Sequence, residues 1–222
     1  GNGIVQILWD RGWRLPLQTL LGTAAEHWAG LFPAFQFDAA SLASDLGQLL
    51  RQRMVSQFEE DGFPPDLVQA VSGEGVSSAR LLQDPVDARE RLLLLQDLRA
   101  DGRLQAVQAV VQRASRLAEK GDLDSSQLVP GRVIEASLFD SPSESDLLKQ
   151  LEALSPLAEA CDYRGLASGL QGAARALEAF FDGENSVMVM AEDDAVRRNR
   201  LSLLGVLRNQ ASVLACFDNI QS

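Results

Sequence analysis

Apolar side chains recur at helical spacing along most of the chain, and residues 39–61 show the pattern most clearly. The apolar positions of this segment are Leu42, Leu46, Leu49, Leu50, Met54 and Phe58. Their spacing of three or four residues predicts a helix with one apolar face. Asp38 before the segment is a favourable N-cap, and Gly62 after it supplies a stop. Ser143 or Ser145 is expected to cap a later helix in the same way.

Comparable patterns predict helices over most of the remaining chain. The expected helical ranges are 3–9, 15–32, 64–73, 86–101, 103–120, 143–161, 163–182 and 195–217. Only residues 185–191, "NSVMVMA", have any strand character, and residues 121–145 are expected to form loops with one turn of helix. The pattern therefore predicts an all-α fold, an antiparallel helical bundle whose helices are joined by short loops.

The last predicted helix carries four arginines and begins within "VMVMAEDDAVRRNRLSLLGVL", residues 187–207. When residues are placed 100° apart, Arg200 falls inside the apolar stripe and Arg198 lies nearly opposite. Arg197 and Arg208 share a flank of the same helix. Because an uncompensated buried charge is destabilising, we expect Arg200 to be structural, tied to a carboxylate or to helix-end carbonyls. Arg198 is the arginine that we expect to be available to a ligand.

Three acidic residues precede these arginines, and they suit the positive end of a helix. They are Glu192, Asp193 and Asp194, of which Asp193 or Asp194 is the expected N-cap. Asp193 with Arg197, and Asp194 with Arg198, have the four-residue spacing of local ion pairs.

A second group of cations lies on the predicted helix over residues 103–120. Arg113, Arg116 and Lys120 gather on the half opposite the apolar side and form a short cationic stripe. Cations near the C-terminus of a helix complement its dipole, which makes a structural role the simpler interpretation. Contact with a polyanion is the alternative.

Composition limits the classes of partner and site. Hydrophobic residues make up 46% of the 222 residues, as in soluble globular proteins, and the net charge is −11. An acidic chain is poorly suited to a non-specific nucleic-acid coat, and we expect neither DNA nor a membrane as a partner. Cys161 and Cys216 are expected to be buried, reduced thiols, although a disulfide between them stays open. With a lone His27 and no clustered cysteines, no metal site is expected.

No catalytic constellation can be assembled from the sequence. Residues 72–78, "SGEGVSS", contain glycines but lack the Lys–Ser/Thr ending and the preceding strand of a phosphate-binding loop. Because the chain has a single histidine, most catalytic arrangements that pair a serine or cysteine nucleophile with a histidine base are excluded. The chain opens with Gly1 rather than Met, so we expect it to be a piece of a longer protein whose active site lies elsewhere.

The segment "AFFDGENSVMVMAEDDAVRRNRLSLLGVL" resembles the C-terminal end of the β subunit of bacterial glycyl-tRNA synthetases. The matching positions are Phe180, Phe181, Asp182, Val187, Met188, Val189, Met190, Asn199, Arg200 and Leu201. Asp194 to Arg197 stand for the Asp-Ala-Leu-Arg motif of that family, with Val196 in place of Leu. Earlier segments agree more loosely, and Gln112 and Arg116 depart from the residues that the family has at those positions.

The resemblance implies a tRNA-binding function without catalysis in this chain. Residues 38–222 would form an all-helical anticodon-binding domain, and residues 1–37 would continue from the upstream part of the subunit. Such synthetases are cytoplasmic α₂β₂ heterotetramers, in which the α subunit binds ATP and Mg²⁺ and activates glycine. The chain would then share in glycine–tRNA ligase activity through contacts with glycine tRNA and the α subunit.

The residues expected to touch tRNA are the exposed cations of the two helices. They are Arg197, Arg198, Arg208, Arg113, Arg116 and Lys120, while Asp194, Asn199 and Arg200 are expected to be structural. An alternative hypothesis is a non-catalytic helical scaffold that docks a partner subunit. The two differ in salt dependence, because RNA binding weakens steeply as salt rises and apolar docking does not.

Overall fold

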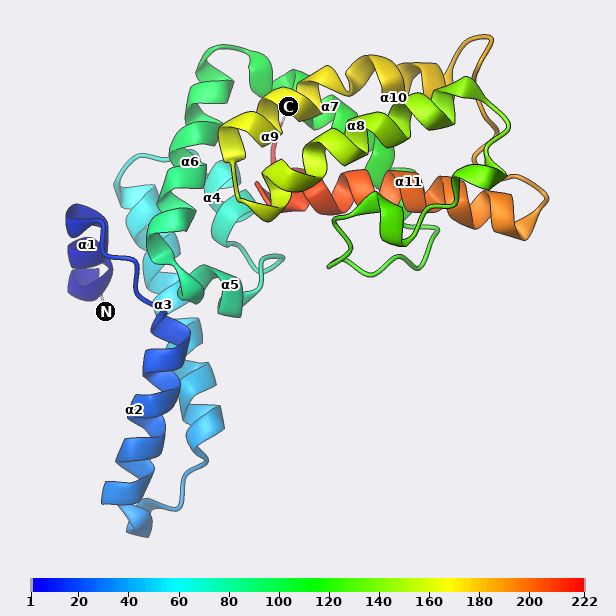
Figure 1. Cartoon of the computed structure of the whole chain (residues 1–222). Helices are drawn as coiled ribbons and strands as arrows, with labels where there is room; N and C mark the ends of the chain where they lie inside the picture. The colour runs from blue at the N-terminus through cyan, green and yellow to red at the C-terminus, as the bar shows by residue number, and fades with distance from the viewer. Residues whose placement is uncertain (1, 222) are drawn as a thin grey trace. The chain divides into compact units, whose positions relative to one another are not determined.

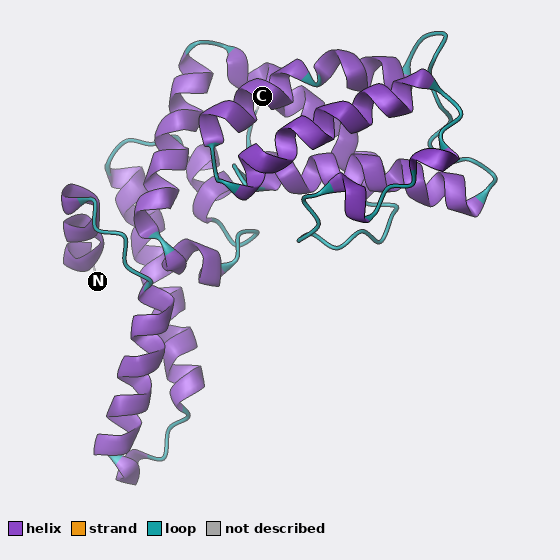
Figure 2. Cartoon of the chain, viewed as in Figure 1, coloured by secondary structure: helices purple, strands orange, loops and turns teal. Residues whose placement is uncertain are grey.

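The computed structural model describes residues 2–221, and the predicted all-α class is confirmed there. Every regular element in this range is a helix, and no strand is formed (Figure 2). The strand candidate, residues 185–191, forms turns and irregular backbone.

The described chain divides into two compact units. The first comprises residues 2–96 together with 219–221, and the second comprises residues 97–218. This division differs from the boundary expected after residue 37, which falls inside the first unit. Residues 1–37 as a separate segment remain a prediction about the parent subunit.

The first unit is built around one long helix. Its elements are α1 (Asn2–Arg11), α2 (Leu17–Leu31), η1 (Pro33–Phe35), α3 (Ala39–Glu60), α4 (Pro65–Ser72), α5 (Ser78–Gln83) and most of α6 (Pro85–Ala100). Asp38 caps α3 as predicted, because its carboxylate accepts a hydrogen bond from the Ser41 amide at 2.8 Å. Gly62, with a φ of 88°, ends this segment as expected. Helix α2 runs alongside α3 (Figure 1).

Aromatic stacking joins α1 to α3 in the core of this unit. The rings of Trp9 and Phe58 are stacked with centroids 4.4 Å apart, and Phe63 meets Phe58 edge-on. The indole N–H of Trp9 donates to the carbonyl oxygen of Pro85 at 2.9 Å. The polar end of this buried side chain is thereby satisfied.

The second unit packs its helices around α11. Its elements are α7 (Arg103–Ala118), η2 (Pro130–Arg132), η3 (Ala136–Leu138), α8 (Pro142–Glu159), α9 (Tyr163–Gly172), α10 (Ala174–Phe181) and α11 (Asp194–Ser212), followed by η4 (Phe217–Asn219) at its end. Helix α11 packs against both α7 and α8 (Figure 1). The leucines that line it, Leu203, Leu204 and Leu207, are fully buried.

Two local predictions were wrong in this unit. The N-cap of α8 is Ser141 rather than Ser143 or Ser145, and it forms a capping box with Glu144. The helix predicted over residues 163–182 is two helices, α9 and α10, joined at Ala173.

The burial of the two cysteines differs from expectation. Both Cys161 and Cys216 are free thiols, so the disulfide that the sequence left open is not formed. Cys161 is exposed rather than buried, because it lies in a turn after α8 with a φ of 53°. Cys216 is half-buried.

Candidate functional site

The start of α11 is held by one carboxylate. Asp193 is the N-cap, and its Oδ1 accepts hydrogen bonds from the amides of Ala195 at 2.8 Å and Val196 at 3.0 Å. The Val196 and Ala195 amides hold the pKa of Asp193 below its ordinary value, because they stabilise the ionised form. The sequence left Asp193 and Asp194 as alternatives, and the structure selects Asp193.

We expect replacement of Asp193 by Ala to lower the melting temperature at neutral pH, since two amides of α11 lose their acceptor. The folded-state pKa lies below the unfolded value of about 3.9, so this stabilisation is present above that pH. It is lost as the pH falls through the folded-state pKa. Thermal melts between neutral and acid pH check both statements. Asp193→Asn is the control, because it keeps an acceptor oxygen; equal melts for wild type and Asp193→Ala at neutral pH would contradict the assignment.

Arg200 is buried and paired with carboxylates, as its place in the apolar stripe predicts. It is 4% exposed, and its Nε donates to Oε1 of Glu144 at 2.9 Å. Nη2 pairs with Asp140, and Nη1 donates to the carbonyl oxygen of Met188 at 3.1 Å. Burial alone would lower the pKa of the guanidinium, but the hydrogen bonds and charges of Glu144 and Asp140 outweigh it and raise the pKa. Arg200 therefore ties α11 to α8 and to the loop before α8.

Asn199 fixes a second loop to α11. Its Oδ1 accepts from the backbone N–H of Glu135 at 2.9 Å, and its Nδ2 donates to the carbonyl oxygen of Glu135 at 3.0 Å. These two hydrogen bonds satisfy the backbone N–H and C=O groups of Glu135, which lies outside the α-helices. Asn199 therefore holds the backbone at Glu135 against α11.

Arg197 folds back onto the beginning of its own helix. Its Nη2 pairs with Asp194, three residues before it, and its Nη1 donates to the carbonyl oxygen of Ala191 at 2.9 Å. The ion pairs expected at four-residue spacing, Asp193 with Arg197 and Asp194 with Arg198, are replaced by this one. The reason is that the Asp193 carboxylate already serves the helix amides.

Arg198 is exposed and lines a cavity of about 330 Å³. The other lining residues are Asp122, Val133, Glu135, Leu138, Ala195, Asn199 and Ser202. Its Nε lies 3.4 Å from the carbonyl oxygen of Asp194, a long and weak contact. The two acidic side chains make this cavity better suited to a neutral or cationic group, such as the edge of a base, than to a phosphate.

Arg208 belongs to a different part of α11. Its Nη2 donates to the carbonyl oxygen of Leu123 at 3.3 Å, and it lines a separate cavity of about 170 Å³. Its neighbour Asn209 is buried and donates from Nδ2 to the carbonyl oxygens of Asp124 and Gln127. The loop after α7 is therefore held by the C-terminal half of α11.

Gln210 is a structural residue that the sequence reasoning missed. It is fully buried, and its Nε2 donates to the carbonyl oxygens of Leu128 and Leu151 and to the hydroxyl of Ser155. Its place beside the apolar positions of α11 could have indicated this role. A polar side chain at such a position is expected to be buried, and a buried amide needs hydrogen-bond partners.

The cations of α7 do not join the α11 arginines at a common site. Arg113 pairs with Asp182, and its guanidinium lies 4.5 Å from the centroid of the Phe181 ring. Arg116 and Lys120 are exposed at the C-terminal end of α7.

Among residues 2–221, no cluster of three or more His, Cys, Asp or Glu side chains could hold a metal ion. Over that range, none of the helices combines the length and the apolar character that a membrane span requires.

Comparison with known proteins gives one consistent result. The glycine–tRNA ligase β subunit of Picosynechococcus sp. is 40% identical over 225 residues, covering 99% of this chain and 31% of that protein. Those of Acaryochloris marina and Vibrio cholerae are 40% and 28% identical, over 99% and 93% of the chain and 31% and 28% of those proteins. No family model matches the chain. The chain spans about a third of the curated relatives it matches, and it resembles part of the β subunit of glycine–tRNA ligases over nearly its whole length.

Proposed function

We propose that this chain is the tRNA-binding, anticodon-recognising part of a glycine–tRNA ligase β subunit. The observation that carries the proposal is its similarity to such subunits over 99% of its length, at up to 40% identity among the relatives above. In this proposal the chain supports the ligase reaction in the cytoplasm as part of an α₂β₂ assembly. The α subunit supplies the active site, with ATP and Mg²⁺.

The proposed mechanism is recognition of single-stranded anticodon bases. Such bases are splayed from the stack, placed on aromatic or guanidinium planes, and read along their edges. Arg198 suits this role because it is exposed at a cavity with acceptor groups from Glu135 and Asp122. Asn199 and Arg200 anchor the same turn of α11, so the helix presents Arg198 from a fixed backbone.

The six cations proposed to contact tRNA differ in how firmly they are held by partners within the protein. Arg113 and Arg197 are engaged with carboxylates, and Arg208 with a carbonyl oxygen, so RNA would have to displace these partners. Arg116 and Lys120 are exposed and suit phosphates at the outside of the site. Arg198 is the first candidate for contact with a base.

The deciding experiment is a titration of the chain with glycine tRNA and with the same tRNA carrying an altered anticodon. We expect the unaltered tRNA to bind more tightly, because edge contacts with bases discriminate between sequences. Equal affinity for both would remove the anticodon assignment. Titrations at several salt concentrations give the number of phosphate contacts, since the slope for single strands is about −0.7 per phosphate.

Replacement of Arg198 by Ala is expected to weaken tRNA binding and leave the melting temperature nearly unchanged. The side chain is exposed and has only a weak contact within the protein. Loss of one phosphate contact would reduce the salt slope by about 0.7, whereas loss of a base contact would leave the slope unchanged and reduce discrimination. Arg175→Ala, an exposed arginine of α10, is the control. Equal loss of affinity in both variants would contradict a specific role for Arg198.

A second candidate function is a scaffold that docks a partner subunit. It is favoured by apolar side chains exposed along α2 and η1, namely Leu20, Trp28, Leu31, Phe32 and Phe35. Trp28 and Phe32 have ring centroids 4.5 Å apart, and Phe35 is 71% exposed. Contiguous exposed apolar surface of this kind marks interaction sites in soluble proteins. Binding of the isolated α subunit that is insensitive to salt would favour this candidate.

A further inference from the structure

Arg51 of α3 is a buried arginine with two N–H groups that have no hydrogen-bond partner among the described residues. The residue is 8% exposed, and its Nε and Nη2 atoms are buried and make no hydrogen bond within residues 2–221. A buried polar group normally has a partner, and a buried charge is destabilising without one. Burial lowers the pKa of the Arg51 guanidinium from its ordinary value, and nearby Glu74 opposes this effect.

The two unsatisfied atoms lie on the same edge of the guanidinium. This edge presents two parallel N–H donors, which match the two oxygens of a carboxylate or a phosphate. An arginine of the second unit binds a carboxylate in this way. Nε and Nη2 of Arg200 donate to Oε1 and Oε2 of Glu144 at 2.9 and 3.4 Å. Arg51 offers the same pair of donors without a carboxylate to receive them.

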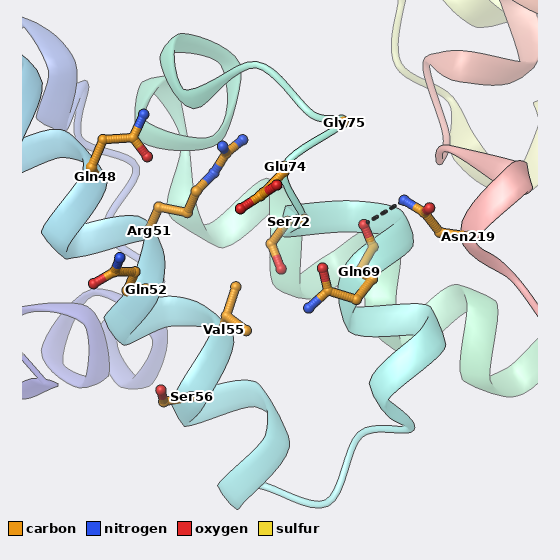
Figure 3. A pocket seen from close by; sticks show the side chains of 11 residues that line it. Gln48, Arg51, Gln52, Val55, Ser56, Gln69, Ser72, Glu74, Gly75 and Asn219 are labelled. Atoms are coloured by element: carbon orange, nitrogen blue, oxygen red, sulfur yellow. Dashed lines mark hydrogen bonds between the residues drawn. The ribbon is translucent and has the colours of Figure 1, made fainter.

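Arg51 extends into a cavity of about 530 Å³ within the first unit (Figure 3). Its polar lining comes largely from amides and hydroxyls of Gln48, Gln52, Gln69, Asn219, Ser56 and Ser72. Asn219 is held in place by donating from Nδ2 to the carbonyl oxygen of Gln69 at 3.2 Å. A cavity of this volume with a few convergent polar groups is typical of a small-molecule site.

The charged residues that line the cavity limit the charge of the ligand that it can bind. Arg51 is the only cation and Glu74 the only acid among its described lining residues. Figure 3 shows the two side chains extending toward the same space from α3 and from the segment after α4. A single guanidinium beside a carboxylate favours a group of low negative charge over a polyanion.

We propose that this cavity binds a small polar molecule through one oxyanion group, a carboxylate or a phosphate, that receives both N–H donors of Arg51. The amides of Gln48, Gln52 and Gln69 then hydrogen-bond the rest of the molecule. Residues 72–75, which the sequence excluded as a nucleotide loop, contribute to the wall without forming a phosphate-binding turn.

The test is calorimetric titration of the 222-residue chain with acetate and with inorganic phosphate, with chloride used to keep ionic strength constant. The variants are Arg51→Met, which keeps the length without the charge, and Arg51→Lys, which keeps the charge without the paired donors. Arg53→Met, an exposed arginine on the same helix, is the matched control. Thermal melts in the same buffers give a second measurement.

We expect one probe to bind wild type and Arg53→Met in the millimolar range and to raise their melting temperatures. Binding is expected to be lost in Arg51→Met and weakened at least tenfold in Arg51→Lys. Preference for acetate assigns a carboxylate ligand, and preference for phosphate assigns a phosphate. Equal affinity of wild type and Arg51→Met for both probes, or binding of RNA but of neither probe, would overturn the proposal. In chloride buffer without acetate or phosphate, we expect the melting temperature of Arg51→Met to be no lower than that of wild type. This result would show that the variant folds.

Discussion

Replacement of Glu144 by Ala is expected to lower the free energy of unfolding by about 3–5 kcal/mol, because it removes one partner of a buried ion pair. Glu144 is fully buried, and its Oε1 accepts from Nε of Arg200 at 2.9 Å. Its Oε2 accepts from the backbone amides of Asp140 and Ser141, each at 3.0 Å. The variant therefore leaves Arg200 with less compensation and removes half of the capping box of α8.

Chemical unfolding monitored by circular dichroism measures this loss. Glu152→Ala is the matched control, since Glu152 is exposed on the same helix and its removal should have little effect. The double variant Glu144→Leu, Arg200→Met removes both charges and is expected to recover part of the stability, because no buried charge then lacks its partner. A loss in Glu144→Ala no larger than that in Glu152→Ala would show that the pair does not stabilise the fold.

Replacement of Phe180 by Ala is expected to cost about 3–5 kcal/mol, as for other fully buried phenylalanines. Phe180 has no exposed surface and meets the ring of Phe181 edge-on, with centroids 5.4 Å apart. The carbonyl oxygen of Phe180 also accepts from the amide of Val187 at 3.0 Å, which joins α10 to the segment before α11. A cavity at this position would weaken the packing at the end of α10.

Phe181→Ala is the comparison for this second variant, because Phe181 is only half-buried. It loses the contact between its ring and the Arg113 guanidinium, which contributes about 0.5–1 kcal/mol at an exposed site. Unfolding curves of the two variants should therefore differ clearly. Equal destabilisation would mean that the packing of Phe180 is not the dominant contribution.

The existence of most helices could be predicted because helical periodicity is a local property of the sequence. The cap Asp38 and the stop Gly62 followed from residue type alone. The prediction failed for α5, which is short, and for the break at Ala173 between α9 and α10. Neither feature has a strong local signal, since a six-residue helix and a one-residue break are stabilised by packing against neighbouring helices.

For the candidate site, the position of Arg200 in an apolar stripe predicted the class of its partner but not the partner itself. Glu144 is 56 residues away, and only folding brings it to Arg200. The acidic surroundings of Arg198 were missed for the same reason, because Asp122 and Glu135 come from the loop after α7. Arg51 gave no signal, because the segment at Glu74 that lines the same cavity lies more than twenty residues away in the sequence.

By itself, the sequence determined the helical class, the apolar faces of the helices and the resemblance to a known subunit, which covers nearly the whole chain and is strongest near its C-terminal end. These features depend on residue order within a few helical turns. Only the tertiary structure decided which of the described arginines are exposed, which are bound to carboxylates, and that Arg51 is buried beside a cavity. The physical reason is that the free energy of a charge depends on the groups around it, and those groups come from segments distant in the sequence.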